Sequence, residues 1–228
     1  MTQPNHQRFD TASMPWQPQA PGVDRMELAE GVGSHGDGDP GWQISLVRLA
    51  AGCSLPAPPP GRGIEVLVCD GTWHLRAADA GLTALPKNSY ARTPPGVFAD
   101  GATLENTTTT GTTLLVRSGP FASGDTEVIQ VQSDQQPWLP GQGNLRVQPL
   151  HSSGDSGTAL VHWPAGERFQ PHRHWGGEEI FVLSGKFEDE HGSYPTGTWL
   201  LSPHLSAHHP FVTEETIIFV KTGHLPQT

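Results

Sequence analysis

The stretch Pro171–Gly185 reads PHRHWGGEEIFVLSG. It contains two histidines one residue apart, His172 and His174, then Trp-Gly-Gly, then an apolar run that opens with two glutamates. Alternate side chains of a strand leave the same face, so both imidazoles would point one way. A tight glycine turn would bring Glu178 back toward them, while Glu179 would face solvent. The stretch therefore predicts two short strands that gather three metal-ligating side chains.

The outline of this stretch occurs a second time, earlier in the chain. PPPGRGIEVLVCDG (Pro58–Gly71) has the same glycines and the same apolar run but no histidine. Its final glycine and Gly185 are 114 residues apart (185 minus 71). The motif PWxP also occurs twice, at Trp16 and Trp138. The stretch TTLLVRSG corresponds to TIIFVKTG near the end of the chain. The chain thus consists of two copies of one unit.

Both copies are predicted to be all-β. Their apolar runs, such as IEVLVC, TWLLSP and TIIFVK, are short, rich in β-branched residues and bounded by Gly and Pro. The 27 glycines and 22 prolines favour many turns. No segment repeats apolar residues with a helical period over three turns. We expect two tandem barrels or sandwiches, in domains 1–120 and 121–228.

Composition excludes several classes of function. A formal net charge of −10 with scattered basic residues argues against nucleic-acid binding. The chain has no apolar run of 18 residues and no visible secretory signal, so we expect a cytoplasmic protein with no membrane partner. Cys53 and Cys69 are expected to be reduced thiols.

A fourth ligand is predicted from SPHLSAHHPF. His208 and His209 are adjacent, so only one can face the interior of an extended chain, and the repeat favours His208. Three imidazoles and a carboxylate suit Zn, Fe(II), Mn, Ni or Cu. On an octahedral ion they would leave two positions for substrate, whereas on tetrahedral zinc they would complete a structural site. His204 and His209 are expected to be exposed.

The first copy has none of these ligands. Alignment of the copies places Pro58, Pro60, Ile64 and Ala99 at the four ligand positions, and none of these side chains binds a metal. We therefore expect the first copy to keep the fold without the metal site.

The ligand spacing, from Gly166 through the two histidines and Glu178 to Gly185, followed by Pro-x-x-x-x-His, resembles the two signature motifs of the cupin superfamily. Cupins are jelly-roll (double-stranded β-helix) barrels that hold one metal through three His and one Glu. The resemblance implies two tandem cupin barrels. It implies one divalent ion, Zn or Fe with Mn or Ni as alternatives, bound by His172, His174, Glu178 and His208. Leu205 stands where cupins usually have glycine.

The phrases GGEEIFVLSG, F-x-DEHG-x-YP-x-GTW and KTGHL resemble the C-terminal cupin domain of ChrR anti-sigma factors. In that family the cupin binds zinc and follows a helical anti-sigma domain with its own zinc. The sequence has no Cys-rich helical segment ahead of its first copy, so sigma-factor binding is not expected. The same branch is similar to small iron dioxygenases that cleave β-diketones.

Two functions follow from these observations. The first is a metal-binding bicupin that responds to a small ligand or oxidant as a regulatory, sensor-type protein. The alternative is a metal-dependent dioxygenase acting on a small diketone or related substrate. Catalytic residues stay unassigned, since Glu178, His204 and His209 are the only candidates for a base. The partner is expected to be a small molecule, and the chain a monomer or homodimer.

Overall fold

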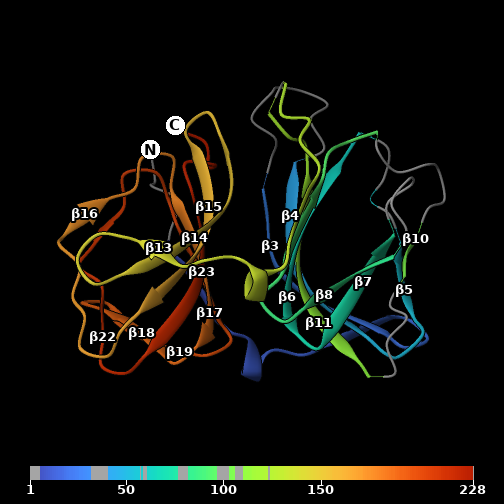
Figure 1. The fold of residues 1–228 in the computed structure, drawn as a ribbon, viewed down its shortest axis with the longest axis horizontal. Helices are drawn as coiled ribbons and strands as arrows, with labels where there is room; N and C mark the ends of the chain where they lie inside the picture. Colours follow the sequence, from blue (N-terminus) through green and yellow to red (C-terminus); the bar gives the residue numbers. More distant parts are fainter. Residues whose placement is uncertain are drawn as a thin grey trace. The chain divides into compact units, whose positions relative to one another are not determined.

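A computed structural model describes residues 6–31, 41–56, 58, 61–76, 82–96, 103–105, 110–122 and 124–227. Over these ranges the regular elements are strands, apart from two 3-10 turns, η1 (Thr11–Ser13) and η2 (Ser133–Gln135) (Figure 1). Short strands dominate because Gly and Pro interrupt every apolar run. The predicted all-β fold is confirmed.

The first large sheet has the strand order β12-β9-β6-β11-β4-β3-β2. Its strands are β2 (Gln17–Ala20), β3 (Val23–Gly31), β4 (Trp42–Leu49), β6 (Gly63–Asp70), β9 (Tyr90–Thr93), β11 (Thr112–Gly119) and β12 (Ile129–Val131). Two antiparallel pairs accompany it, β5 (Ser54–Pro56) with β10 (Thr103–Glu105) and β7 (Thr72–Arg76) with β8 (Leu82–Pro86).

The second large sheet has the order β1-β20-β17-β23-β15-β14-β13, which matches the first position for position. Its strands are β1 (Gln7–Asp10), β13 (Leu139–Pro140), β14 (Arg146–Ser153), β15 (Ser156–Trp163), β17 (Glu178–Ser184), β20 (Thr198–Ser202) and β23 (Thr216–Thr222). Smaller sheets accompany it, β16 (His172–Arg173) with β21 (Ala207–His208), and β19 (Gly192–Pro195), β18 (Lys186–Asp189) and β22 (Phe211–Val212). The internal repeat is thus a repeat of topology, and each copy is a jelly-roll barrel.

Contacts divide the chain into two compact units. Barrel 1 is Pro15–Gln136, and barrel 2 is Pro137–Thr228 together with Met1–Met14. Strand β1, which precedes the first PWxP motif, therefore pairs with β20 of barrel 2. Strand β12, which precedes the second motif, pairs with β9 of barrel 1. Each arm strand lies on the barrel encoded by the other repeat, an exchange that the repeat pattern did not indicate; the domain boundary at residue 120 stays a prediction.

Each barrel has its own apolar core. In barrel 1 the core includes Trp73, Leu85 and Leu114, and in barrel 2 it includes Trp163 and Phe187, whose rings meet edge to face at 5.6 Å between centroids. Burying such side chains is the main favourable term in folding, at about 1.5–3 kcal/mol each. The core of barrel 2 fixes the strands that carry the predicted ligands.

Glu179 does not face solvent as expected. Its side chain is buried, and its Oε1 accepts a hydrogen bond of 3.0 Å from Nε1 of Trp199. Trp199 is itself stacked against Phe9 of β1, at 5.8 Å between ring centroids. The prediction was wrong because the arm strand extends the sheet beside Trp199, which a reading of Pro171–Gly185 alone does not include.

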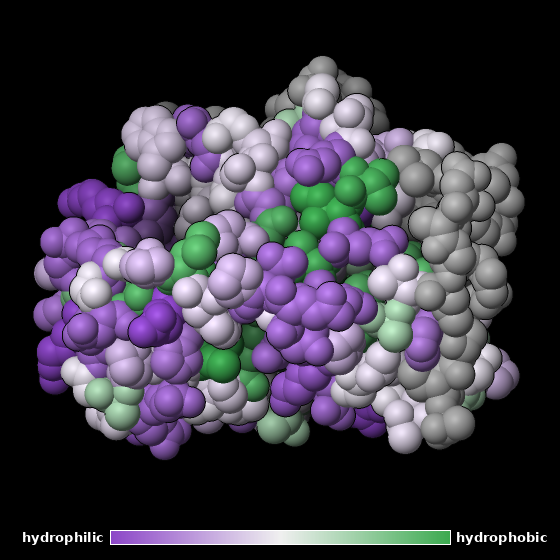
Figure 2. All heavy atoms as spheres, viewed as in Figure 1, coloured by the Kyte–Doolittle hydropathy of each residue, from purple (hydrophilic) through white to green (hydrophobic). Residues whose placement is uncertain are grey.

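The described residues on the face drawn in Figure 2 are mainly hydrophilic, with smaller hydrophobic patches between them. This agrees with the acidic composition, which favours solubility. Among the described residues, no helix has the length and apolar composition needed to cross a membrane.

Candidate metal centre

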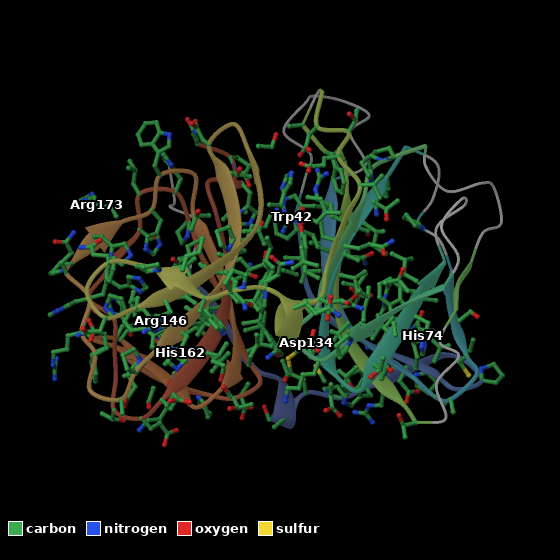
Figure 3. All side chains as sticks on the ribbon, in the orientation of Figure 1. Trp42, His74, Asp134, Arg146, His162 and Arg173 are labelled. Carbon is green, nitrogen blue, oxygen red and sulfur yellow. The ribbon has the colours of Figure 1, made fainter. Side chains whose placement is uncertain are left out.

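Two short strand pairs bring the predicted ligands together. His172 of β16 pairs directly with His208 of β21, and His174 follows β16 by one residue. Glu178 is the first residue of β17 and pairs with Ser202 of β20. Arg173, between the two histidines, is exposed and points away from the barrel (Figure 3). The alternation predicted for HRH is therefore present.

The turn between His174 and Glu178 requires its two glycines. Gly176 and Gly177 have φ of +68° and +73°, which side chains rarely adopt. A Cβ on Gly177 would lie 2.8 Å from the carbonyl oxygen of Ser202. His204, expected to be exposed, is partly buried, and its Nδ1 accepts a hydrogen bond of 2.9 Å from the amide of Gly176. His204 thus supports the turn.

The four side chains form one compact cluster. One potential ligand atom from each of His172, His174, Glu178 and His208 lies within 4.8 Å of all the others. The imidazole centroids are 4.6–4.8 Å apart. Glu178 Oε1 lies 3.5 Å from His174 Nδ1 and 3.6 Å from His208 Nε2. Donors around one ion with bonds of about 2.0–2.2 Å are separated by similar distances.

Two buried donor atoms in this cluster lack a hydrogen-bond partner. They are His174 Nε2 and Glu178 Oε1, whose residues are 5% and 7% exposed. A buried polar atom without a partner costs about 1–3 kcal/mol, more if it is charged. A cation at the centre of the cluster would satisfy both atoms, so the residues fit a divalent metal.

Burial also sets the charge of these groups. It lowers the pKa of His174 to about 3, with help from His208 and His172, and it lowers the pKa of His172. Burial raises the pKa of Glu178 to about 7. Both histidines are therefore neutral near pH 7 and ready to coordinate, while Glu178 is poised between its acid and its carboxylate.

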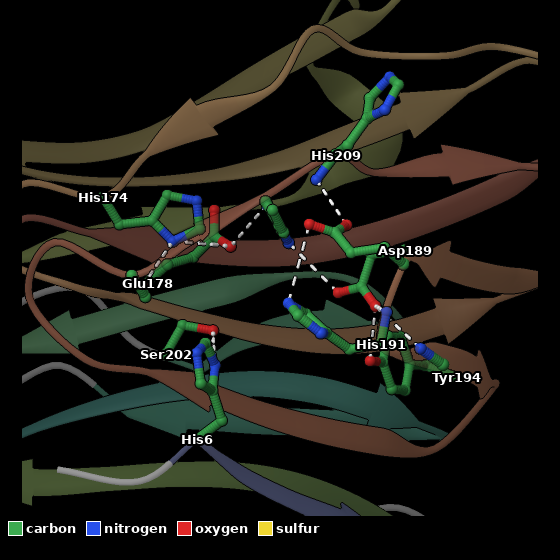
Figure 4. Close-up of polar contacts among 12 residues, drawn as sticks. His6, His174, Glu178, Asp189, His191, Tyr194, Ser202 and His209 are labelled. Carbon is green, nitrogen blue, oxygen red and sulfur yellow. Dashed lines mark hydrogen bonds and ion pairs between the residues drawn. The ribbon is translucent and has the colours of Figure 1, made fainter. Parts of the chain in front are cut away.

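Each imidazole is oriented by a further group that lies near its Nδ1. His172 Nδ1 lies 3.0 Å from the carbonyl oxygen of Gln170, and His174 Nδ1 lies 3.4 Å from Ser206 Oγ. His208 Nδ1 lies 3.4 Å from Asp189 Oδ2 (Figure 4). Such partners fix the ring orientation and the tautomer of metal-binding histidines.

Asp189 is the most strongly held of these supporting groups. Its Oδ1 accepts hydrogen bonds from the Tyr194 hydroxyl (2.8 Å) and from the amides of His191 and Gly192. Burial would raise its pKa, but the bonds from His208 and Tyr194 outweigh burial and hold the pKa at about 2. Asp189 is therefore ionised at any physiological pH.

A pocket opens beside the cluster. Its enclosed part has room for about one water molecule, and the rest of its roughly 260 Å³ is open to solvent. Its wall is formed by His208, Ile180, Leu200, Ser202, Asp189, Tyr194, His6, Gln7 and Arg8. Arg8 lies in β1, and His6, which directly precedes β1, is drawn in Figure 4. The candidate site thus combines the ligand cluster, two apolar side chains and several hydrogen-bonding groups around an open depression.

Sequence reasoning placed the four ligands together but missed the groups around them. Asp189 was visible only as part of the DEHG phrase, and no signal indicated His6 or Arg8 because they reach barrel 2 through the arm exchange. His209 is exposed as expected, its amide donating to Glu190 Oε2. In barrel 1, Ile64 lies in the apolar core at the position of Glu178, and Pro58 is partly buried. Pro60 and Ala99 lie outside the described residues.

Comparison with known families decides what kind of barrel this is. Residues 126–226 match the ChrR Cupin-like domain family. The second barrel resembles the ChrR-like cupins. Curated protein sequences give no match to the chain.

Solved structures with cupin folds match nearly the whole chain. A candidate glyoxylate-induced protein from Pseudomonas aeruginosa has a TM-score of 0.74 and 13% identity, over 97% of this chain and 90% of that one. A candidate dioxygenase from Nostoc punctiforme has a TM-score of 0.67 and 15% identity, over 98% of this chain and 84% of that one. The 7S globulin of Momordica charantia has a TM-score of 0.62 and 12% identity, over 96% of this chain and 84% of that one. At these identities the similarity shows the tandem cupin fold alone.

Proposed function

We propose that barrel 2 of this bicupin binds one divalent metal ion through His172, His174, Glu178 and His208. The observation that carries the proposal is the pair of buried donor atoms without a hydrogen-bond partner, His174 Nε2 and Glu178 Oε1, within a cluster of three imidazoles and one carboxylate. Nitrogen and oxygen donors without sulfur suit Zn or Fe(II), with Mn or Ni as alternatives. A bound ion of this kind supplies a Lewis-acidic centre for an oxygen atom of a ligand.

The bicupin is proposed to act as a regulatory, sensor-type protein that binds a small molecule or responds to an oxidant at this centre. The match of residues 126–226 to the ChrR Cupin-like domain family supports this function. The chain's own residues would select the ligand: Ile180 and Leu200 offer apolar contacts, and Ser202 and His6 offer hydrogen bonds. Binding of the metal and binding of the ligand would each order the short strands β16 and β21.

Elemental analysis tests metal binding. The full chain would be purified without chelators or affinity metals, beside His208→Ala and the control His209→Ala. We expect about one Zn or Fe per chain in the wild type and in His209→Ala, and loss of the metal in His208→Ala with the fold retained by circular dichroism. Wild-type protein that neither contains nor takes up a divalent ion would refute the proposal.

A metal-dependent dioxygenase is the second candidate, and the open pocket favours it. The pocket is open to solvent beside His208 and is lined by Ile180 and Leu200, so a small organic molecule would approach the proposed metal centre from this side. The similarity to a candidate dioxygenase from Nostoc punctiforme agrees with this candidate at the level of fold. Oxygen uptake by the iron-loaded chain with pentane-2,4-dione, absent in His208→Ala, would support catalysis over sensing.

A further inference from the structure

The arm at β1 extends the ligand-bearing face of barrel 2. Gln7 pairs with Leu201, so the preceding residue, His6, lies beside Ser202, and its Nδ1 is 3.2 Å from Ser202 Oγ. Ser202 in turn pairs with Glu178. His6, Ser202 and Glu178 therefore form one row across three strands, with a predicted metal ligand at its end.

A second row lies one step along the same face. Arg8 pairs with Leu200, and Leu200 pairs with Ile180, two residues after Glu178. Side chains two residues apart share a face of a strand, so Arg8, Leu200 and Ile180 lie on the same face as the first row. His6 and Arg8 both line that pocket.

The corresponding arm of barrel 1 provides an internal comparison. Strand β12 pairs with β9 as β1 pairs with β20: Ile129 lies opposite Arg92 and Gln130 opposite Ala91, as Gln7 lies opposite Leu201 and Arg8 opposite Leu200. Val128 and Gln130 thus occupy the positions of His6 and Arg8. The row in barrel 1 ends at Ile64, which pairs with Thr93 as Glu178 pairs with Ser202.

The two barrels therefore differ in a correlated way. Barrel 2 has metal-ligating side chains and an arm with a histidine and an arginine facing them, whereas barrel 1 has neither. An arm that only closed the edge of a sheet would need neither a histidine nor an arginine, because Val128 and Gln130 occupy the same register in barrel 1. The polar groups of β1 thus go with the ligands rather than with the fold.

Arg8 has donors to spare for a ligand. Its Nη1 donates to the carbonyl oxygen of His191 at 2.9 Å, and its guanidinium lies 5.2 Å from the centre of the Tyr194 ring. Among the described residues no carboxylate pairs with it. A guanidinium held by a carbonyl oxygen and an aromatic ring at the wall of a pocket is suited to an anionic oxygen group.

We propose that the arm completes the ligand site of barrel 2, with His6 and Arg8 contacting a small 2-oxo or 2-hydroxy carboxylate. Arg8 would bind the carboxylate, His6 would hydrogen-bond the ligand, and the second oxygen would lie toward the metal. This inference rests on the proposed metal site, and it adds the class of ligand. The repeat that supplies the arm is not the one that supplies the metal ligands.

Calorimetric titration of the full chain loaded with one equivalent of Zn²⁺ tests the inference. The probes are pyruvate and its neutral near-isostere 2,3-butanedione. The variants Arg8→Gln and His6→Val transplant the side chains of the other arm, which the same strand register already accommodates. Arg146→Gln, an exposed arginine on β14 outside the pocket (Figure 3), is the matched control.

Wild type and Arg146→Gln should bind pyruvate more tightly than 2,3-butanedione. Arg8→Gln should weaken pyruvate by about tenfold or more and leave 2,3-butanedione unchanged, because only the charge-assisted contact is lost. His6→Val should weaken both probes. Zinc content, measured in the same samples, should stay at one per chain. A wild type without zinc refutes the metal site itself. Retained zinc with no pyruvate binding, or with equal binding by Arg8→Gln, refutes the role of the arm alone.

Discussion

Asp189 and His208 form a buried carboxylate–imidazole pair, in which Oδ2 lies 3.4 Å from Nδ1 and each side chain is 7% exposed. The pair turns the other nitrogen of His208, Nε2, toward Glu178. Because Tyr194 and two backbone amides hold the opposite oxygen of Asp189, the carboxylate cannot rotate away without losing several hydrogen bonds at once. The candidate metal centre is therefore supported from a strand, β18, that contributes none of the four predicted ligands.

Asp189→Asn should weaken metal binding by about 10–100-fold, since an amide neither orients nor polarises His208 as a carboxylate does. The measurement is a competition titration of Zn²⁺ against a chelator of known affinity. Glu188→Gln, the neighbouring carboxylate that bonds Thr213 and Ser193 instead, is the control and should bind Zn²⁺ like wild type. Equal affinity for Zn²⁺ in Asp189→Asn and wild type would show that the contact between Asp189 and His208 does not influence metal binding.

Much of the fold could be predicted because it is repeated. Two copies of one strand pattern, each bounded by glycines and prolines, allowed only a double all-β architecture, and the two sheets share one strand order. The arm exchange could not be predicted from the repeat. Strand β1 has the same local sequence character whichever barrel it joins, so its partner is decided by chain topology rather than by the pattern of Gln7–Asp10.

The same physical limit applies to the site. His172, His174 and Glu178 could be grouped because a short turn and strand alternation fix their spacing locally, and His208 could be added because the internal repeat favoured it. Asp189 acts on His208 from another strand, and His6 lies 196 residues from Ser202 in sequence. Contacts of such long range leave no periodic signal. The wrong expectation for Glu179 has the same origin, because its burial depends on Trp199 and the arm.

Metal binding should release a proton from Glu178 at mildly acid pH. Burial raises its pKa from 4.5 to about 7, so below pH 7 an incoming cation displaces a proton, whereas above pH 8 the carboxylate is already ionised. His174, with its pKa lowered to about 3, is neutral throughout and adds no proton. Zn²⁺ affinity should therefore rise about tenfold from pH 6 to pH 8 and then level off. Titrations in two buffers of different ionisation enthalpy count the protons, and no release at pH 6 would contradict the raised pKa.

Gly177→Ala should destabilise the chain more than Gly166→Ala. Both glycines have positive φ, +73° and +82°, so alanine costs about 1 kcal/mol at either position. A Cβ at Gly177 would also lie 2.8 Å from the carbonyl oxygen of Ser202, while a Cβ at Gly166 would meet nothing within 4 Å. Urea unfolding with bound Zn²⁺ removed should show the difference. Equal losses of unfolding free energy in the two variants would mean that the turn at Gly176 and Gly177 accommodates a Cβ at no cost in energy.

Leu205→Gly should stabilise barrel 2. Leu205 has φ of +61°, in the left-handed region that costs a non-glycine residue about 1–2 kcal/mol, and its side chain is 41% exposed. Glycine removes this strain but adds backbone freedom to the unfolded chain at about 0.5–1 kcal/mol, so a gain of about 0.5–1 kcal/mol remains. The reverse exchange in barrel 1, Gly96→Leu, should cost a similar amount, because Gly96 has φ of +81° and open space around it. Unfolding free energies of both variants, with zinc content unchanged in Leu205→Gly, check the pair. A loss of stability in Leu205→Gly would show that the leucine contributes contacts that outweigh its backbone strain.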